Sequence, residues 1–367
     1  MSILYISTQL CKWSWWKTLV SGEEMAARCL PYVCFIVLLI LLRICMEAQA
    51  GLLGPTPDEE VEALGEIARK LGKKDWKFSK DPCLNDSTSS YNNSVSCNCH
   101  YPGGVCHIEL IKLSGEDLAG ILPSALVQLP YLKHMSFTGN NLSGPIPNYL
   151  GNITTLEYLS IENNLFSGTV PPELGNLDNL ETLILSANNL IGELPATLTR
   201  LNKLRELICG NNFTRKLPDF FRSWKQLEKL ETQGSGLNGP IPASISVLKD
   251  LTDLRISDLH GEGSDFLPLM NMRHMKELKL SSCNISGEIP AYIPNMTHLG
   301  KLDLSFNRLE KEIPEFEGLK NLTNMYLTSN LLTGDIPNWI RNSNQYDFCT
   351  KIFQNFARGL FSLLYFL

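Results

Sequence analysis

The stretch NNLSGPIPNYLGNITTLEYLSIENNLFSGTVP, residues 140–171, contains nearly the same phrase twice, with Asn, an apolar residue, Gly and Pro at matched places. Aligned with the pattern LxxLxLxxNxLxGxIP, the chain repeats this phrase ten times, at intervals of 24 residues except two of 23. We call the Asn position of the pattern the slot. It falls on Glu116, Asn140, Asn164, Asn188, Asn212, Ser235, Leu259, Cys283, Asn307 and Asn330. A fixed period of this length predicts a stack of repeating units.

Each recurring residue type has a physical role in such a stack. Apolar residues five and three positions before the slot, such as Leu159 and Ile161, alternate as in a strand with one buried face. The slot Asn can hydrogen-bond backbone groups that stacked turns bury. The pattern resembles the leucine-rich repeat. That resemblance implies an α/β solenoid, a right-handed curved stack of about ten units of 23–24 residues with a parallel sheet on its concave face.

Two units depart from the pattern. Pro218 follows Asn212 by six residues instead of seven, so either Asn211 or Asn212 could fill the slot, and only the other could carry a sugar. Around Leu259, the sequence DLHGEGSDFLP (258–268) lacks the Asn, the Gly and the Ile-Pro. A bent joint or ligand-binding island is one interpretation, and a tolerated irregular repeat is the one we favour. We also expect two buried free thiols, Cys209 in a strand and Cys283 in a slot.

Length and charge restrict the possible functions. A chain of 367 residues would ordinarily suggest two or three globular domains, but the repeats run from residue 108 to 337 without a break. The net charge of −6 provides no basic field, and we expect no nucleic-acid partner. The sequence shows no kinase HRD or DFG motif, no HExxH motif and no nucleophile elbow. We therefore predict that this chain is not an enzyme and uses no cofactor or metal.

The N-terminal 50 residues indicate a targeting signal. Residues 1–24 precede a second start at Met25 and are interpreted as a spurious or upstream extension. Residues 25–50 combine a basic start, an apolar run and small residues before a cleavage site, which predicts a secretory signal peptide. The apolar run at 30–42 is shorter than the roughly 20 residues that span a bilayer, so a permanent signal anchor is the lesser alternative. We expect the secretory pathway and an extracellular location.

Residues 51–107 are expected to form an N-terminal cap with disulfides. Four cysteines lie just before the first repeat: Cys83, Cys97, Cys99 and Cys106. In a secreted chain they predict two disulfides, whose pairing the sequence does not determine. A zinc site completed by His100 or His107 is the alternative, which the single residue between the second and third cysteine disfavours. An amphipathic helix around residues 61–71 would cover the exposed edge of the first repeat.

Asn-X-Ser/Thr sequons support a secreted chain, and they predict N-linked sugars. There are eight: Asn85, Asn92, Asn141, Asn152, Asn212, Asn284, Asn295 and Asn321.

A resemblance to a known family rests on three features. The segment VEALGEIARKLGKKDWKFSKDPC (61–83), the following VSCNCH (95–100) and the GxIP repeats resemble the ectodomain of plant leucine-rich-repeat receptor-like serine/threonine kinases. The segment DLHGEGSDFLPLMNM (258–272) points to the group with a malectin-like domain after the repeats. The resemblance implies an extracellular solenoid joined through a membrane-spanning helix to a cytoplasmic kinase, and none of these later parts follows here. Residues 338–367 leave the repeat period, and we interpret them as an atypical, truncated tail.

Side chains six, four and two residues before each slot should point outward, where they can vary without disturbing the core. From these columns we select candidate ligand or partner residues: Tyr158, Glu162, Glu206, Lys229, Glu231, Asp253, Arg255, Glu277, Lys279, Lys301, Asp303 and Tyr326. The early ones are small and weakly acidic, and the later ones alternate in sign. One interpretation is a solvated face held by weak cross-strand ion pairs. The other is a polar docking strip with Tyr158 and Tyr326 as anchors.

Two function classes remain open. In the first, the chain is the ligand-sensing or co-receptor ectodomain of a receptor-like kinase, attached to the membrane only through a segment that this chain lacks. In the second, it is a complete secreted binder akin to leucine-rich-repeat inhibitors of cell-wall-degrading enzymes. The expected partners are a peptide, an oligosaccharide or another cell-surface receptor ectodomain.

Overall fold

The computed structural model describes residues 37, 39, 40, 55–74, 76, 82–83, 93–335 and 337–341. The extension predicted at 1–24, nearly all of the signal peptide predicted at 25–50, the sequons Asn85 and Asn92, and tail residues 342–367 lie outside these residues. The chain divides into two compact units, one of Met1–Gly54 with Pro102–Gly104, which carries the short helix η2 (Pro102–Gly104), and one of Pro55–Tyr101 with Val105–Leu367. No helix among the described residues is long and apolar enough to cross a membrane.

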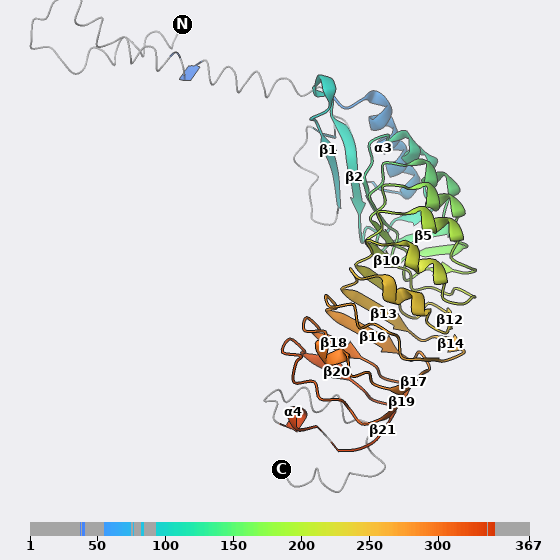
Figure 1. The fold of residues 1–367 in the computed structure, drawn as a ribbon. Coiled ribbons are helices and arrows are strands. Elements are labelled where there is room, and N and C mark those ends of the chain that lie inside the picture. The colour runs from blue at the N-terminus through green and yellow to red at the C-terminus, as the bar shows by residue number, and fades with distance from the viewer. Residues whose placement is uncertain are drawn as a thin grey trace, which may run out of the picture. The chain divides into compact units, whose positions relative to one another are not determined.

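An eleven-stranded sheet runs through the second unit (Figure 1). Its strands, in spatial order, are β1 (Asn93–Asn98), β2 (His107–Leu113), β4 (His134–Ser136), β6 (Tyr158–Ser160), β8 (Thr182–Ile184), β10 (Glu206–Ile208), β11 (Lys229–Thr232), β13 (Asp253–Ser257), β16 (Glu277–Ser281), β18 (Lys301–Asp303) and β20 (Asn324–Tyr326). β1 pairs antiparallel with β2, and every later pair is parallel. The predicted parallel sheet of a leucine-rich-repeat solenoid is confirmed.

Shorter elements complete each repeat on the sides away from this sheet (Figure 1). Short strands form three small parallel sheets: β3 (Ala119–Gly120), β5 (Asn141–Pro145), β7 (Leu165–Gly168) and β9 (Asn189–Leu190); β12 (Asn238–Gly239) and β14 (His260–Gly261); and β15 (Ser264–Asp265), β17 (Ile285–Glu288), β19 (Arg308–Lys311) and β21 (Leu331–Leu332). Short 3-10 helices follow: η3 (Ser124–Gln128), η4 (Asn148–Asn152), η5 (Pro172–Asn176), η6 (Ala196–Arg200), η7 (Asp219–Ser223), η8 (Ala243–Val247) and η9 (Ile293–Asn295). The short helix α4 (Asn338–Arg341) follows the last repeat.

The repeats share one apolar core. Leu159 and Ile161 point inward from the main sheet, Leu174 points inward from η5, and all three are fully buried in one cluster that extends from the cap to the last repeat. The 3-10 helices pack so closely that a side chain would not fit at some glycines. A Cβ on Gly175 would lie 2.4 Å from the carbonyl oxygen of Thr197 in the next repeat.

The slot asparagines form the expected ladder. Asn164 donates from Nδ2 to the carbonyl oxygens of Phe137 (2.8 Å) and Ile161 (3.1 Å), while its Oδ1 accepts the N–H of Leu142 at 3.0 Å. Slots at Asn140, Asn188, Asn307 and Asn330 repeat this arrangement. Each of these five asparagines therefore serves backbone groups of its own repeat and of the one before.

Asn211 occupies the fifth slot, so the position first aligned with Asn212 is corrected by one residue. Asn211 is buried and accepts the N–H of Asn188 at 3.1 Å, whereas Asn212 is exposed. The repeat is one residue short between its strand and its slot, and Gly210 makes this possible. A Cβ there would lie 2.4 Å from the carbonyl oxygen of Gln233.

The cysteines predicted as free thiols are both buried and free. Cys283 takes over part of the slot role, because its Sγ lies 3.3 Å from the carbonyl oxygen of Ile256. Burial raises the pKa of Cys209 and of Cys283 to about 12.

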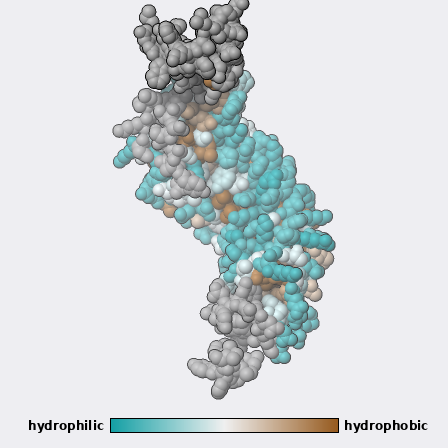
Figure 2. All heavy atoms as spheres, turned by 90° about the vertical axis from the view of Figure 1, so that its left-hand side faces the viewer, coloured by the Kyte–Doolittle hydropathy of each residue, from teal (hydrophilic) through white to brown (hydrophobic). Residues whose placement is uncertain are grey.

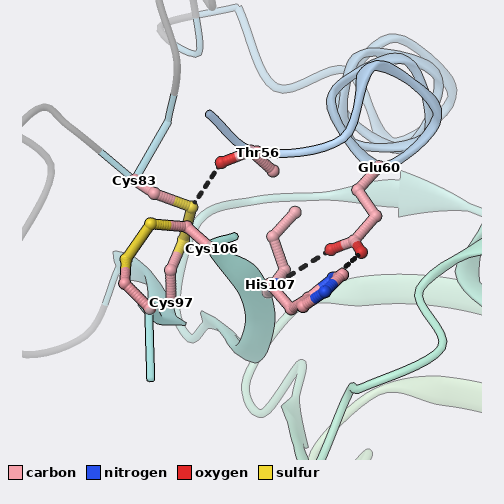
Figure 3. Close-up of a disulfide and its surroundings, with 8 residues drawn as sticks. Thr56, Glu60, Cys83, Cys97, Cys106 and His107 are labelled. Atoms are coloured by element: carbon pink, nitrogen blue, oxygen red, sulfur yellow. Dashed lines mark hydrogen bonds and ion pairs between the residues drawn. A yellow bond between two sulfur atoms is a disulfide. The ribbon is translucent and has the colours of Figure 1, made fainter. Parts of the chain in front are cut away.

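The cap joins a helix, two disulfides and the edge of the sheet. The predicted helix is present as α3 (Asp58–Leu71), and disulfides link Cys83 to Cys97 and Cys99 to Cys106. Figure 3 shows how Glu60 of α3 reaches β2: its carboxylate lies 2.5 Å from Nδ1 of His107 and accepts the N–H of Ile108 at 2.9 Å. The Glu60 side chain thereby fixes the helix against the first parallel strand.

Candidate functional site

The register of the main sheet aligns the outward side chains in columns. Lys229, Asp253, Glu277 and Lys301 are paired in one column, and Glu231, Arg255, Lys279, Asp303 and Tyr326 are paired in the next. We call the outward side of this sheet the sheet face. The register therefore assembles the later predicted site residues into one continuous surface.

Arg255 is the centre of the later half of this face. Its guanidinium contacts three carboxylates, those of Glu277 (2.8 Å), Glu231 (3.4 Å) and Asp253 (3.4 Å). Lys301 also reaches Glu277, at 3.4 Å. With three acidic neighbours already around it, Arg255 has little unsatisfied charge to offer a partner.

The other later cations are more loosely held. Lys279 lies 3.9 Å from Asp303, and Lys229 lies 4.0 Å from Glu231. Four cations (Lys229, Arg255, Lys279, Lys301) and four anions (Glu231, Asp253, Glu277, Asp303) give 4 − 4 = 0 net charge. Because these side chains are partly exposed, and that of Lys301 is exposed, each pair contributes about 0.2–1 kcal/mol to stability.

The early half has a different construction. On the sheet face, the middle column Ser160, Ile184 and Ile208 is buried, with exposed fractions of 1, 8 and 9 %. Tyr158 on one side and Glu162 on the other are partly exposed. The side chains of this middle column, which we call the floor, are thus more buried than those on either side, and two of them are apolar.

Aromatic and acidic groups flank that floor. The Tyr158 ring stacks on His134, with centroids 5.9 Å apart, and Ser186 donates to Glu162 at 2.7 Å. Burial raises the pKa of Tyr158, a hydrogen bond with Ser160 opposes this shift, and the charges of Glu206 and Glu162 raise the pKa further. Glu206 and Glu162 therefore act electrostatically on the same aromatic side chain.

The two tyrosines predicted as anchors are far apart. Tyr158 lies on β6 and Tyr326 on β20, seven strands further along the sheet. At about 4.8 Å per strand, their backbones are about 34 Å apart. A small ligand could not contact both, so they would serve only an extended partner.

The sequons within the described residues avoid the strands of the main sheet. Asn141 lies at the start of β5, Asn152 and Asn295 end 3-10 helices, and Asn212, Asn284 and Asn321 lie in connecting segments. All are exposed except Asn284, which is partly exposed. Sugars at these positions would start outside the strands of the sheet face.

Sequence reasoning missed three features. Ile208 was not selected, although its place beside Ile184 follows from the same spacing. The contact of Tyr131 with His107, with ring centroids 4.0 Å apart, depends on the cap and had no signal in the repeat pattern. Phe306 is 61 % exposed and has a φ of 58°, an uncommon backbone conformation for a bulky residue.

Family profiles match most of the repeats. The profile described as leucine-rich repeat region covers residues 124–265, and the profile described as leucine rich repeat covers 274–296 and 321–343. The chain belongs to the leucine-rich-repeat family. One relative of this leucine-rich-repeat chain is a probable LRR receptor-like serine/threonine-protein kinase of Arabidopsis thaliana, 43% identical over 86 residues. That alignment covers 21% of this chain and 8% of the relative, so the chain spans less than a tenth of that protein.

Solved structures of plant receptor kinases are also similar to this chain. The leucine-rich-repeat chain is similar to the receptor kinase HAESA of Arabidopsis, solved with the peptide hormone IDA and the co-receptor SERK1, with a TM-score of 0.63 and 28% identity over 78% of this chain and 52% of that one. It is also similar to the ectodomain of the Arabidopsis thaliana receptor kinase GASSHO1/SCHENGEN3, solved with CASPARIAN STRIP INTEGRITY FACTOR 2. There the TM-score is 0.57 and the identity 34%, over 61% of this chain and 27% of that one.

Proposed function

We propose that this chain is the extracellular recognition module of a plant receptor-like serine/threonine kinase, and that its sheet face binds a peptide or a co-receptor ectodomain. The observation that carries the proposal is the sheet face itself. It presents a continuous surface of outward side chains on a rigid core, and the sequons in the described residues lie outside its strands.

The comparisons support the class of protein that we propose. The relative described above is a probable receptor-like kinase, and the two similar solved structures are of receptor kinases in complexes, one of them with a peptide hormone and a co-receptor. The signal peptide and sequons predicted from the sequence agree with an extracellular location. The twelve candidate residues lie on the proposed binding face, of which a partner would contact only a part.

A sugar placed on the sheet face provides a direct test. Lys279→Asn creates a sequon with Ser281 on β16, and Tyr158→Asn creates one with Ser160 on β6. Each substitution should attach a bulky sugar to one half of the face. The full chain would be secreted from cultured plant cells and used to select binders from a displayed random-peptide library.

We expect the unmodified chain to enrich peptides that an unrelated secreted protein does not enrich. At least one of the two added sugars should abolish that binding, and enzymatic removal of the sugar from the same variant should restore binding at least in part. Asn295→Gln, which removes a sequon at η9, should have no effect. Failure to enrich any peptide, or binding that tolerates both added sugars, would refute the proposal that the sheet face binds a peptide.

A further inference from the structure

The two halves of the sheet face differ in charge balance. On β4, β6, β8 and β10 and in the column two residues before each slot, the outward positions hold no Lys or Arg and two carboxylates, Glu162 and Glu206. These positions therefore carry a charge of −2, whereas the eight charged residues of the later half sum to zero. Any compensation for the early carboxylates must come from elsewhere in the chain or from a partner.

The cations nearest to Glu206 contact other carboxylates. Lys229 is paired in register with Glu206, but its Nζ lies 4.0 Å from Glu231. Arg205 precedes Glu206 in sequence, and its guanidinium lies 2.5 Å from Glu228 and 3.6 Å from Glu181. Among the described residues, no ion pair or side-chain hydrogen bond reaches the Glu206 carboxylate.

Glu162 is similarly without a cation in the described part of the chain. Its carboxylate accepts a hydrogen bond from the Ser186 hydroxyl at 2.7 Å, which is a neutral contact. Glu162 and Glu206 lie on opposite flanks of the floor formed by Ile184 and Ile208, and Tyr158 lies on the same flank as Glu206.

The floor adds an apolar element to the acidic flanks. Ile184 and Ile208 are neighbours in register, and both interrupt a column that is otherwise polar or charged from Lys112 to Tyr326. Figure 2 shows several small hydrophobic areas among the hydrophilic atoms of the face that it presents. We call Tyr158, Glu162, Ile184, Glu206 and Ile208 together the acidic trough.

We propose that the acidic trough binds a peptide segment that presents a Lys or Arg side chain beside an apolar side chain. Its cationic group would be attracted to Glu162 and Glu206 and could lie over the Tyr158 ring, since cations bind aromatic faces. The apolar side chain and the methylene stem of the Lys or Arg would cover Ile184 and Ile208. A neutral oligosaccharide would leave both carboxylates uncompensated.

This inference rests on the proposed function, and it names the ligand class and the half of the face that binds it. The same displayed random-peptide library would be selected on the full secreted chain and on three paired variants. Glu162→Gln with Glu206→Gln removes the trough charges. Glu173→Gln with Glu315→Gln removes one partly exposed and one exposed charge outside the strands of the main sheet. Arg255→Gln with Lys279→Gln removes two cations from the later half.

The enriched peptides should carry Lys or Arg within two residues of a Leu, Ile or Phe. One such peptide, made synthetically, should bind the trough variant at least tenfold more weakly and the other two variants within twofold of the unmodified chain. Its affinity should also fall as NaCl is raised, because salt screens partly exposed charges. Replacing its Arg with citrulline should weaken binding to the unmodified chain but hardly change binding to the trough variant.

The outcomes separate the two proposals. Peptides that bind but depend on Arg255 and Lys279 instead would overturn the trough and preserve the proposed function. Enriched peptides without basic residues, or an unchanged affinity in the trough variant, would do the same. No enrichment on the unmodified chain would refute peptide binding at the sheet face, and the trough proposal with it. Thermal melts of all three variants would establish that they are folded before their affinities are compared.

Discussion

Replacing Asn211 with Ala tests the slot assignment most directly. Its Oδ1 accepts the N–H groups of Asn188 at 3.1 Å and Leu190 at 3.4 Å, and its Nδ2 donates to the carbonyl oxygen of Leu185 at 3.0 Å. Alanine can make none of these bonds. The backbone groups that remain are buried between two repeats, so water cannot easily replace the lost side chain.

The expected loss follows from the two shorter bonds. A buried donor or acceptor left unpaired costs about 1–3 kcal/mol, and the 3.4 Å contact should add little. We therefore expect Asn211→Ala to lower the free energy of unfolding by about 2–6 kcal/mol. Asn212→Ala is the matched control, because Asn212 is exposed and an exposed substitution usually changes stability by less than about 0.5 kcal/mol.

The assay is denaturant unfolding followed by circular dichroism, with both variants and the parent enzymatically deglycosylated first. Glycopeptide mapping of the untreated parent should find sugar on Asn212, which heads the sequon Asn212-Phe213-Thr214. If Asn212→Ala were the more destabilising change, and Asn212 were without sugar, the slot would belong to Asn212 and the register argued here would be wrong.

Three further predictions concern packing, the cap and the buried thiols. Gly175→Ala should destabilise the chain by more than about 1 kcal/mol in denaturant unfolding, because its Cβ would lie 2.4 Å from a carbonyl oxygen, whereas Gly300→Ala, with a closest contact of 3.6 Å, should be tolerated. Glu60→Ala should cost about 2–4 kcal/mol and increase hydrogen exchange in α3, since it leaves His107 and a buried N–H without their partner. Iodoacetamide at pH 8 should not label Cys209 or Cys283 until the chain is unfolded, because burial raises the pKa of both thiols to about 12. Above about pH 8.5 the unfolded thiols lose protons that the folded ones keep, so the free energy of unfolding should fall as pH rises. Peptide mapping would check the labelling, and thermal melts between about pH 8 and 10 would check the loss of stability.

The repeat spacing was sufficient to predict most of the fold. A period of 23–24 residues fixes which side chains point inward, so the buried positions of Leu159 and Ile161 follow from arithmetic on the sequence. The position of Pro218 left both Asn211 and Asn212 open as the slot, and spacing could not choose between them, because the choice depends on Gly210 closing a shortened turn against Gln233 in the next repeat. The disulfide pairing likewise depends on how the cap folds back on the first strand, which spacing alone does not encode.

The candidate site was only partly predictable, for a related reason. Alternating charges on neighbouring strands indicate that ion pairs can form, but not which acid each cation selects. Arg255 contacts three carboxylates. Lys229 lies near Glu231, although Glu206 is its partner in the strand register. These choices involve side-chain geometries that differ by fractions of a kcal/mol at a partly exposed surface. They nevertheless decide which carboxylates remain uncompensated.

The irregular repeats connect the ladder to this charge pattern. Ser235 and Leu259 cannot make the bonds of a slot asparagine, and the strands before them are longer: β11 has 4 residues and β13 has 5, against 3 in β6, β8 and β10. The strand before Cys283, β16, also has 5 residues. The added pairs, such as Thr232 with Ile256, give strand partners to backbone that elsewhere turns toward an asparagine. Longer parallel strands hold neighbouring repeats in register further along the sheet. The charged columns cross this region, where Arg255 reaches acids on both adjacent strands. We therefore interpret the irregular repeats as the rigid, self-neutralised part of the sheet face, and place ligand recognition in the regular repeats before them.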